Sequence, residues 1–541
     1  MTDGEPLLVD TGRGFNITYR AKTLYSPRNP RAAAVRRADT LSVEPKTLVF
    51  VPSLGLGYGL HELLARLPDS CHVLCIEIDE RLFKLALSRG PRLPKSPHLS
   101  IIRTDRREQA AAIVQQLGPW RFRRVVPLHL CGGYRLYRAQ YERLQRAVEE
   151  EIRLYWQNRL TLFAMTRLWL RNLFTNLAVL PACGDIVDLA TDRPLLVCGA
   201  GPSLENSLSW IADHRRAVIL LAVDTALPVL AQADLPPDWV FTLDAQIHTL
   251  RDFLPFRDSG IKILCDLTSN PQSLRLFRDL YFFSTRFHPL TLFDRLESAR
   301  LLPTPLPPRG SVGVSAVEAA LTLTSGPILF TGLDFAYSRG QTHARGAPFQ
   351  LASLAENSRL RPCGMTAFQT LLDRPRLRLA GKTGEQLLTD LVLDSYRRQL
   401  VGVIESCTRC FDLSGQGLPV GAPGIDSEIQ LAQLLELGEN HRLRSDNGGG
   451  REGAGLEEVE KFCEHEQSLL KLVIQAIAED SRDLSRRDLS RLIAPVDYLS
   501  LLLPQPDPHR LLEAGNLRTI DSIARDLLLS LQHTRQSLGE R

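Results

Sequence analysis

The stretch Pro194-Leu-Leu-Val-Cys-Gly-Ala-Gly-Pro-Ser-Leu204 decides the fold, because an apolar run breaks there into a glycine-rich turn. The run is typical of a buried parallel strand, and the glycines allow a turn too tight for a Cβ. A helix that starts directly afterwards presents backbone N–H groups and the positive end of its dipole, which suits a phosphate. We therefore expect a nucleotide phosphate to bind the loop formed by Gly199, Gly201, Pro202 and Ser203.

This loop differs from the two common phosphate-binding motifs. It lacks the third glycine of the dinucleotide fingerprint, and a proline follows its second glycine. It is not a P-loop either, because no Gly-Lys-Ser/Thr follows. By itself a Gly-x-Gly turn between a strand and a helix is also common without any ligand, so the residues further along the chain carry the argument.

Length and composition indicate a multidomain globular protein. A chain of 541 residues is too long for one core, and roughly two to four domains are expected. Its 44% hydrophobic and 23% charged residues are typical of globular domains. The net charge of +4 comes from 65 basic and 61 acidic side chains, which gives no sign of a nucleic-acid partner.

The lack of a recognisable targeting signal and the pattern of cysteines predict a cytoplasmic protein. The first residues, Met1-Thr-Asp-Gly-Glu-Pro6, do not resemble a signal peptide, and no run of about 18 apolar residues predicts a membrane span. The ten cysteines mostly lie in apolar runs, as reduced core cysteines do. One C-x-x-C pair, Cys407 and Cys410, lacks a second pair at zinc spacing, so no metal site is expected there.

Hydrophobic patterning predicts an α/β protein in four parts. Residues 1–150 alternate strands and helices as a Rossmann-like domain does, and residues 151–185 form a connecting helix. Residues 186–385 predict a central, doubly wound α/β domain. Residues 386–541 are mainly helical, with a flexible Gly-rich linker at 446–455.

Polar side chains follow two strands of the central domain. Asp224 and Thr225 end one predicted strand, and Asp244 and Gln246 follow the next. Ligands of open α/β sheets bind at the carboxyl ends of the strands. Each aspartate alone could be a helix cap, but together with the glycine-rich loop they predict a nucleotide site.

A second group of candidates lies after the Pro-rich stretch at 302–308. Gly310 and Ser311 form a turn that opens a helix, which is again favourable for an anion. The strand that follows ends in Gly332 and Asp334.

The loop beyond that strand contains Tyr337 and His343. His343 lies in the polar stretch Gly340-Gln-Thr-His-Ala344, where it could titrate near neutrality and act as a general base. A surface histidine without a role is the alternative.

Together these segments resemble the motility accessory factor family of flagellin glycosyltransferases. The resemblance runs from about residue 45 to about residue 430 and rests on Gly-Ala-Gly-Pro-Ser-Leu, Asp-Thr-Ala, Asp-Ala-Gln, Gly-Ser-Val and Thr-Gly-Leu-Asp-Phe-Ala-Tyr. The family's central domain is similar to pterin diphosphokinases, and the glycine-rich loop and Gly-x-Asp-Phe also resemble bacterial sialyltransferases. The chain departs from the family at Leu333, where a glutamine is usual, and at 412–417.

The resemblance implies transfer of a nonulosonic sugar, of the pseudaminic or legionaminic type, from a CMP donor to Ser or Thr hydroxyls of flagellin. Gly199, Gly201 and Ser203 then match the nucleotide loop, Ser311 a donor-binding element and His343 the base. Tyr337 would bind the leaving phosphate, with Asp334 as the next candidate for the base. No metal or cofactor is required.

Two rival functions remain open. One is an ATP- and magnesium-dependent pterin diphosphokinase, with Asp224, Asp244 or Asp334 as metal ligands. The other is a nucleotide-binding flagellin chaperone without turnover.

The N-terminal Gly55-x-Gly57-x-Gly59 with Glu77 resembles the cofactor motif of methyltransferases. Glycine spacing plus one acid is a weak pattern that many βαβ units share. We interpret this motif as structural, and a bound nucleotide or S-adenosylmethionine is the alternative.

Overall fold

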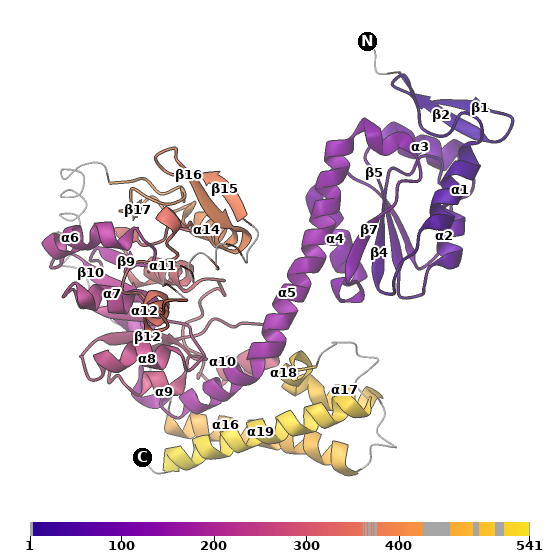
Figure 1. Cartoon of the computed structure of the whole chain (residues 1–541). Coiled ribbons are helices and arrows are strands. Elements are labelled where there is room, and N and C mark those ends of the chain that lie inside the picture. The colour runs from indigo at the N-terminus through magenta and orange to yellow at the C-terminus, as the bar shows by residue number, and fades with distance from the viewer. Residues whose placement is uncertain are drawn as a thin grey trace. The chain divides into compact units, whose positions relative to one another are not determined.

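The computed structural model divides the chain into two compact units, Met1–Ala164 with Pro504–Pro506 and Met165–Leu503 with Asp507–Arg541. It describes residues 4–360, 376–425, 455–479, 486–503 and 513–539, with the single positions 362, 365, 369 and 372. The expected α/β class is confirmed, with parallel sheets and a helical C-terminal part (Figure 1).

The N-terminal unit is a four-stranded parallel sheet in the order β6-β5-β4-β7. Its central strands β4 and β5 are buried along their whole length, which explains their continuous apolar sequence. A small antiparallel sheet, β1-β2-β3, precedes it. The elements of this unit are β1 (Leu7–Asp10), β2 (Phe15–Tyr19), β3 (Lys22–Thr23), α1 (Pro30–Thr40), β4 (Thr47–Pro52), α2 (Leu60–Arg66), β5 (His72–Glu77), α3 (Glu80–Arg89), β6 (Leu99–Arg103), α4 (Arg107–Leu117) and β7 (Arg124–Pro127).

The glycine motif of this unit is filled by the protein's own side chains. The Tyr25 hydroxyl accepts a hydrogen bond from Leu56 N at 2.7 Å, and a Cβ on Gly55 would lie 2.3 Å from that hydroxyl. Glu77, which a ribose would need, is fully buried and accepts bonds from Ser53 Oγ and Tyr141 Oη, both at 2.9 Å. Two backbone N–H groups also donate to it. The geometry therefore agrees with a structural role for the motif.

The second unit is built on an eight-stranded parallel sheet in the order β17-β14-β9-β10-β11-β12-β13-β8. From β9 the chain adds strands in one direction as far as β13, and then returns to place β14 on the other side of β9. The strand order thus reverses between β9 and β14, and this is the position at which doubly wound sheets bind ligands. The strands are β8 (Gly184–Asp185), β9 (Leu195–Cys198), β10 (Ile219–Val223), β11 (Trp239–Thr242), β12 (Lys262–Asp266), β13 (Leu280–Phe283), β14 (Ile328–Thr331) and β17 (Cys410–Asp412).

Helices and one hairpin complete this unit. Helix α11 is buried on nearly every side, which its small and branched residues allow. The hairpin of β15 and β16 lies over the β14 side and is joined to it by a bridge between Tyr337 and Leu388. The remaining elements are α6 (Leu204–His214), α7 (Leu227–Gln232), α8 (Thr249–Phe253), α9 (Pro271–Leu274), α10 (Thr291–Ser298), α11 (Val312–Leu323), α12 (Pro348–Ala355), β15 (Arg376–Ala380), β16 (Gln386–Asp390) and α14 (Leu391–Ile404).

The C-terminal helices α16 (Leu456–Glu479), α17 (Arg486–Ile493), α18 (Tyr498–Leu501) and α19 (Ala514–Gly539) belong to the second unit. Thr534 Oγ donates to Phe174 O at 2.9 Å, and Arg295 forms an ion pair with the fully buried Glu466. Residues 446–454 of the expected linker lie outside the described residues. In the described part of the chain, we find no helix with both the length and the apolar character needed to cross a membrane.

Three elements differ from the sequence-based expectation. The connecting helix α5 (Arg138–Leu177) begins thirteen residues before position 151 and is shared by both units. Strands β16 and β17 lie in the region expected to be mainly helical, and β17 pairs with β14. The central sheet therefore continues beyond residue 385.

The buried Glu77 gives a test of the N-terminal unit. Glu77→Ala would leave four buried donors without an acceptor, so we expect it to lower the unfolding free energy of this unit by about 3 kcal/mol or more. Urea titration with hydrogen exchange of β4 and β5 peptides measures the loss. Glu62→Ala, which removes a surface pair with the exposed Arg31, should cost less than about 1 kcal/mol. Equal effects of the two substitutions would contradict this role.

Candidate functional site

The loops that follow β9 and β14 interlock at the reversal of strand order. Gly199 N donates to Thr331 O and Gly201 N to Gly332 O, both at 2.8 Å. Gly332 has a φ of +70°, and a Cβ there would lie 2.1 Å from Gly199 O. A Cβ on Gly201 would lie 2.0 Å from Asp334 Oδ2. These glycines are therefore required by the contact between the two loops.

The buried carboxylate of Asp334 stabilises the contact between these two loops. Its Oδ2 accepts from Ser203 N at 3.1 Å and from Ser203 Oγ at 3.0 Å. Its Oδ1 is buried and has no hydrogen-bond partner in the described part of the chain. Burial raises the pKa of Asp334, although the bonds from Ser203 and the charge of Lys382 oppose this effect.

The glycine-rich loop offers a ligand fewer unbonded backbone N–H groups than the sequence predicts. The N–H groups of Gly199, Gly201 and Ser203 all donate within the junction. Ser203 has helical φ and ψ angles and does not cap α6 with its side chain, because its hydroxyl is used by Asp334 and Gly332. The dipole of α6 still points its positive end here, but a ligand would meet mainly side chains.

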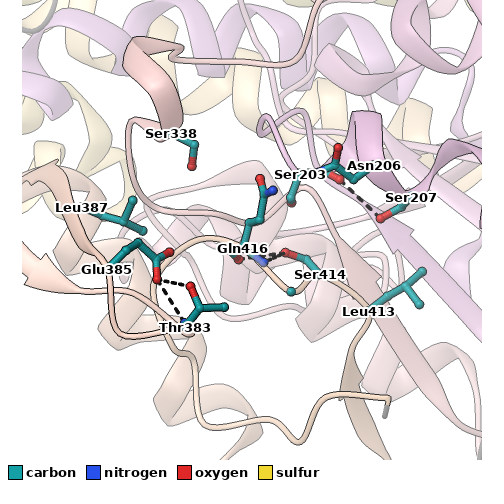
Figure 2. Close-up of a pocket in the computed structure, with 11 residues that line it drawn as sticks. Ser203, Asn206, Ser207, Ser338, Thr383, Glu385, Leu387, Leu413, Ser414 and Gln416 are labelled. Atoms are coloured by element: carbon teal, nitrogen blue, oxygen red, sulfur yellow. Dashed lines mark hydrogen bonds between the residues drawn. The ribbon is translucent and has the colours of Figure 1, made fainter. Parts of the chain in front are cut away.

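A cavity of about 620 Å³ lies beside this junction. Figure 2 shows side chains that line it, and most carry a hydroxyl or an amide. Ser338 Oγ is buried without a partner among the described residues. Neutral donors and acceptors of this kind suit a polyhydroxylated ligand. The lining consists of Ser203, Asn206, Ser207, Ser338, Thr383, Glu385, Leu387, Leu413, Ser414, Gly415 and Gln416.

A partly buried ion pair supports the wall of the cavity formed after β17. Lys382 Nζ lies 2.5 Å from Asp412 Oδ2 and donates to Ser414 O at 2.9 Å. Ser414 Oγ in turn donates to Gln416 O at 2.8 Å. The pair thereby fixes the loop that carries two of the lining side chains.

Glu385 is the ionisable group in the cavity lining. The Thr383 side chain and backbone N–H donate to it, and these bonds lower the pKa of Glu385. It therefore stays ionised at neutral pH and is a weak proton acceptor.

Asp224, Asp244 and Gln246 lie apart from this cavity, at the ends of β10 and β11. Asp224 accepts from Thr242 Oγ1 at 2.9 Å and from Thr225 N at 2.7 Å. Burial, with a smaller contribution from Asp244, raises the pKa of Asp224 to about 6. The carbonyl of Asp244 accepts a hydrogen bond from Asn270 N, and its carboxylate accepts one from the N–H of the exposed Gln246. None of these residues is part of the lining described above.

Tyr337 and His343 occupy different surroundings. The buried Tyr337 donates to Asp390 Oδ2 at 2.5 Å, an aspartate that also caps α14. His343 is half-buried, and its Nδ1 lies 3.2 Å from Thr342 Oγ1. Burial lowers the pKa of His343, so its imidazole is neutral at pH 7. Ala344 N donates to Ala200 O at 2.8 Å, which ties the His343 loop to the glycine-rich loop.

Gly310 and Ser311 lie at the start of α11. Gly310 N donates to Gln399 Oε1 at 3.0 Å, and a Cβ on Gly310 would meet the ring of Tyr396. Ser311 precedes α11 without a side-chain cap. Neither residue belongs to the lining of the cavity.

The acidic and histidine side chains of this unit were also candidates for holding a metal ion. In the described ranges, no three His, Cys, Asp or Glu side chains are grouped closely enough to hold an ion. Both carboxylate oxygens of Asp224 and the Oδ2 of Asp334 instead accept hydrogen bonds from neighbouring hydroxyl and N–H groups.

Sequence reasoning missed the second wall of the cavity. Thr383 and Glu385 come from the hairpin, and Ser414 and Gln416 follow β17. A weak signal was present at residues 381–386, Gly-Lys-Thr-Gly-Glu-Gln, which also resemble the family, whereas the chain departs from the family at 412–417. No site residue was assigned to them since their patterns carry no motif that names a chemistry.

Comparison with known proteins places these features in context. Residues 168–340 match a family model described as "6-hydroxymethylpterin diphosphokinase MptE-like". An uncharacterized protein of Treponema pallidum (strain Nichols) is 29% identical over 539 residues, which cover 94% of this chain and 92% of that protein. A second uncharacterized protein of this organism is 33% identical over 94 residues, 17% of this chain and 45% of that protein.

A solved structure extends the likeness to the whole chain. The MAf glycosyltransferase from Magnetospirillum magneticum AMB-1 matches with a TM-score of 0.56 and 16% sequence identity, over 99% of this chain and 90% of that one. At this identity the match establishes a shared fold. Together the two matches confirm the resemblance to motility accessory factors with an MptE-like central domain.

Gly201→Ala tests the contact between the two loops. The new Cβ would meet Asp334 Oδ2 and Gly332 O, so we expect a loss of about 1–3 kcal/mol of stability. Thermal unfolding by calorimetry measures the change. The control is Gly402→Ala in α14, where a Cβ meets nothing within 4 Å and should be neutral or stabilising. If both variants unfold at the wild-type temperature, the interlock is not needed.

Asp334→Asn tests the buried carboxylate. The amide oxygen can keep both bonds from Ser203, and the variant cannot ionise. Because burial raises the pKa of Asp334, the wild type loses stability as pH rises through that raised pKa. The stability of the variant relative to wild type should therefore increase in urea titrations as the pH rises above about 4, the ordinary pKa of an aspartate. The exposed Asp213→Asn serves as the control, and a pH-independent difference for Asp334→Asn would contradict the assignment.

Proposed function

We propose that this chain, whose fold is that of a motility accessory factor glycosyltransferase, transfers a nonulosonic sugar from a CMP donor to a Ser or Thr hydroxyl of flagellin. The observation that carries the proposal is the cavity at the reversal of strand order, lined mainly by hydroxyl and amide groups. Such a lining matches the many hydroxyls of a sugar, and Ser338 Oγ has no hydrogen-bond partner among the residues that the structure describes.

The donor would lie across the junction of the two loops. Its phosphate would face the positive end of the α6 dipole, and its sugar would meet Ser338, Ser414 and Gln416. In the reaction, the bond between the anomeric carbon and the phosphate oxygen breaks, and CMP leaves with the electron pair. The acceptor oxygen forms the new bond to the anomeric carbon, and its proton passes to a base.

His343 is the base in this proposal. Its neutral imidazole can accept a proton, whereas the lowered pKa of Glu385 makes that carboxylate a poor acceptor. His343 does not line the cavity, but its loop is attached to the glycine-rich loop beside the cavity through the bond from Ala344 N to Ala200 O. Tyr337 and Asp334 then act as positioning residues, because their polar groups bind Asp390 and Ser203.

The rival with a specific observation behind it is the ATP-dependent pterin diphosphokinase, since residues 168–340 match that family model. It would use a nucleoside triphosphate with magnesium and the carboxylates of Asp224, Asp244 or Asp334. A flagellin-binding chaperone without turnover is the non-enzymatic rival.

Ligand-dependent stabilisation separates these functions. CMP at about 100 times its Kd should raise the stability of the second unit by about 2.7 kcal/mol. ATP with magnesium should give no comparable shift, and a chelator should leave transfer from the CMP donor unchanged. Stabilisation by ATP and magnesium alone would favour the diphosphokinase and contradict the proposal.

Replacement of the base tests the chemistry itself. His343→Ala should reduce transfer from a CMP-nonulosonate to flagellin about 10²-fold or more, because the base acts in the transition state. CMP affinity should stay within about twofold of wild type, and the exposed His533→Ala on α19 is the matched control. Normal turnover by His343→Ala would move the base to another residue.

A further inference from the structure

A second cavity, of about 540 Å³, lies in the N-terminal unit at the carboxyl end of β7. The strand order of this sheet also reverses, between β4 and β7, because β5 and β6 lie on the other side of β4. The cavity therefore occupies the position at which open parallel sheets bind ligands. The loop after β4, where a nucleotide would ordinarily be held, is filled by Tyr25, so the space on the β7 side is the one available.

The lining of this cavity combines an apolar floor with a cationic rim. Leu24, Leu128 and Leu130 are buried, and hydroxyl groups come from the β3 end and from α1. Arg37 and Arg135 are exposed at the rim, and no carboxylate belongs to the described lining.

Both guanidinium groups of the rim have N–H donors that are not bonded to a carboxylate of the described residues. Arg37 Nη1 donates to His129 O at 3.0 Å, and Arg135 Nε donates to the Tyr134 hydroxyl at 3.3 Å. Neither forms an ion pair within the described residues, whereas the acidic side chains near α1, Asp39 and Glu62, are paired with other arginines.

The local field is positive as well. Burial lowers the pKa of His129, and the charges of Arg37, Arg135 and Arg138 lower it further. The ring of His129 lies against the ring of Tyr134, with centroids 4.1 Å apart, and forms an aromatic wall. Two guanidinium groups that form no ion pair within the described residues, beside such a wall, suit a phosphate attached to a small organic group.

We propose that this cavity binds a small phosphorylated metabolite of about nucleoside-monophosphate size, with its phosphate on Arg37 and Arg135. The volume lies within the range of small-molecule sites. The proposal concerns the N-terminal unit alone and does not depend on the function proposed for the second unit.

Calorimetric titration of the full chain with AMP and with inorganic pyrophosphate tests the site. The variant Arg37→Gln with Arg135→Gln should weaken binding of the better probe at least about tenfold, because each lost charge-assisted bond is a large part of phosphate affinity. Both arginines are exposed, so the variant should fold, and circular dichroism checks this.

The matched control is Arg36→Gln, an exposed arginine of α1 that does not line the cavity. It should leave the affinity within about twofold of wild type. Three results would overturn the site: no binding of either probe up to about 1 mM, unchanged affinity in the double variant, or an equal loss with Arg36→Gln.

Discussion

The second unit depends on one contact between two loops that lie far apart in sequence. The loop after β9 and the loop after β14 meet at a separation that only glycine permits, and Asp334 then ties Ser203 to the junction. This contact fixes the start of α6, the direction of the chain beyond β14 and one wall of the cavity. A doubly wound sheet leaves a crevice where its strand order reverses, and here the protein closes the base of that crevice with its own hydrogen bonds.

Both units contain a parallel sheet whose strand order reverses, but different side chains surround the two reversals. In the N-terminal unit, Tyr25 fills the glycine-rich loop and Glu77 is saturated by four donors, so the familiar cofactor position is closed. In the second unit, β15, β16 and the segment after β17 add a polar wall beside the junction, and a cavity remains. A fold alone therefore does not assign function, and the side chains around each reversal of strand order must be considered separately.

Much of the fold follows from the sequence, because buried parallel strands such as β9 and β14 are short apolar runs that are directly followed by a glycine. Strand β17 was not predicted, since Cys410–Asp412 is three residues long and is defined by pairing with β14. The meeting of Ser203 with Asp334 was also beyond the sequence, because it spans 131 residues and depends on strand order. Local patterns identified both loops. The strand order alone shows that the N–H groups of each loop donate to acceptors in the other.

The central claim is that a sugar nucleotide binds at the junction of β9 and β14, and a crystal structure of the protein soaked with CMP tests it most directly. The account predicts electron density for CMP in the cavity beside Ser203, with contacts to Ser338 or Ser414. Density for CMP at the ends of β10 and β11, against Asp224 and Asp244, would contradict the account. So would an empty cavity in crystals soaked at a concentration that stabilises the protein in solution.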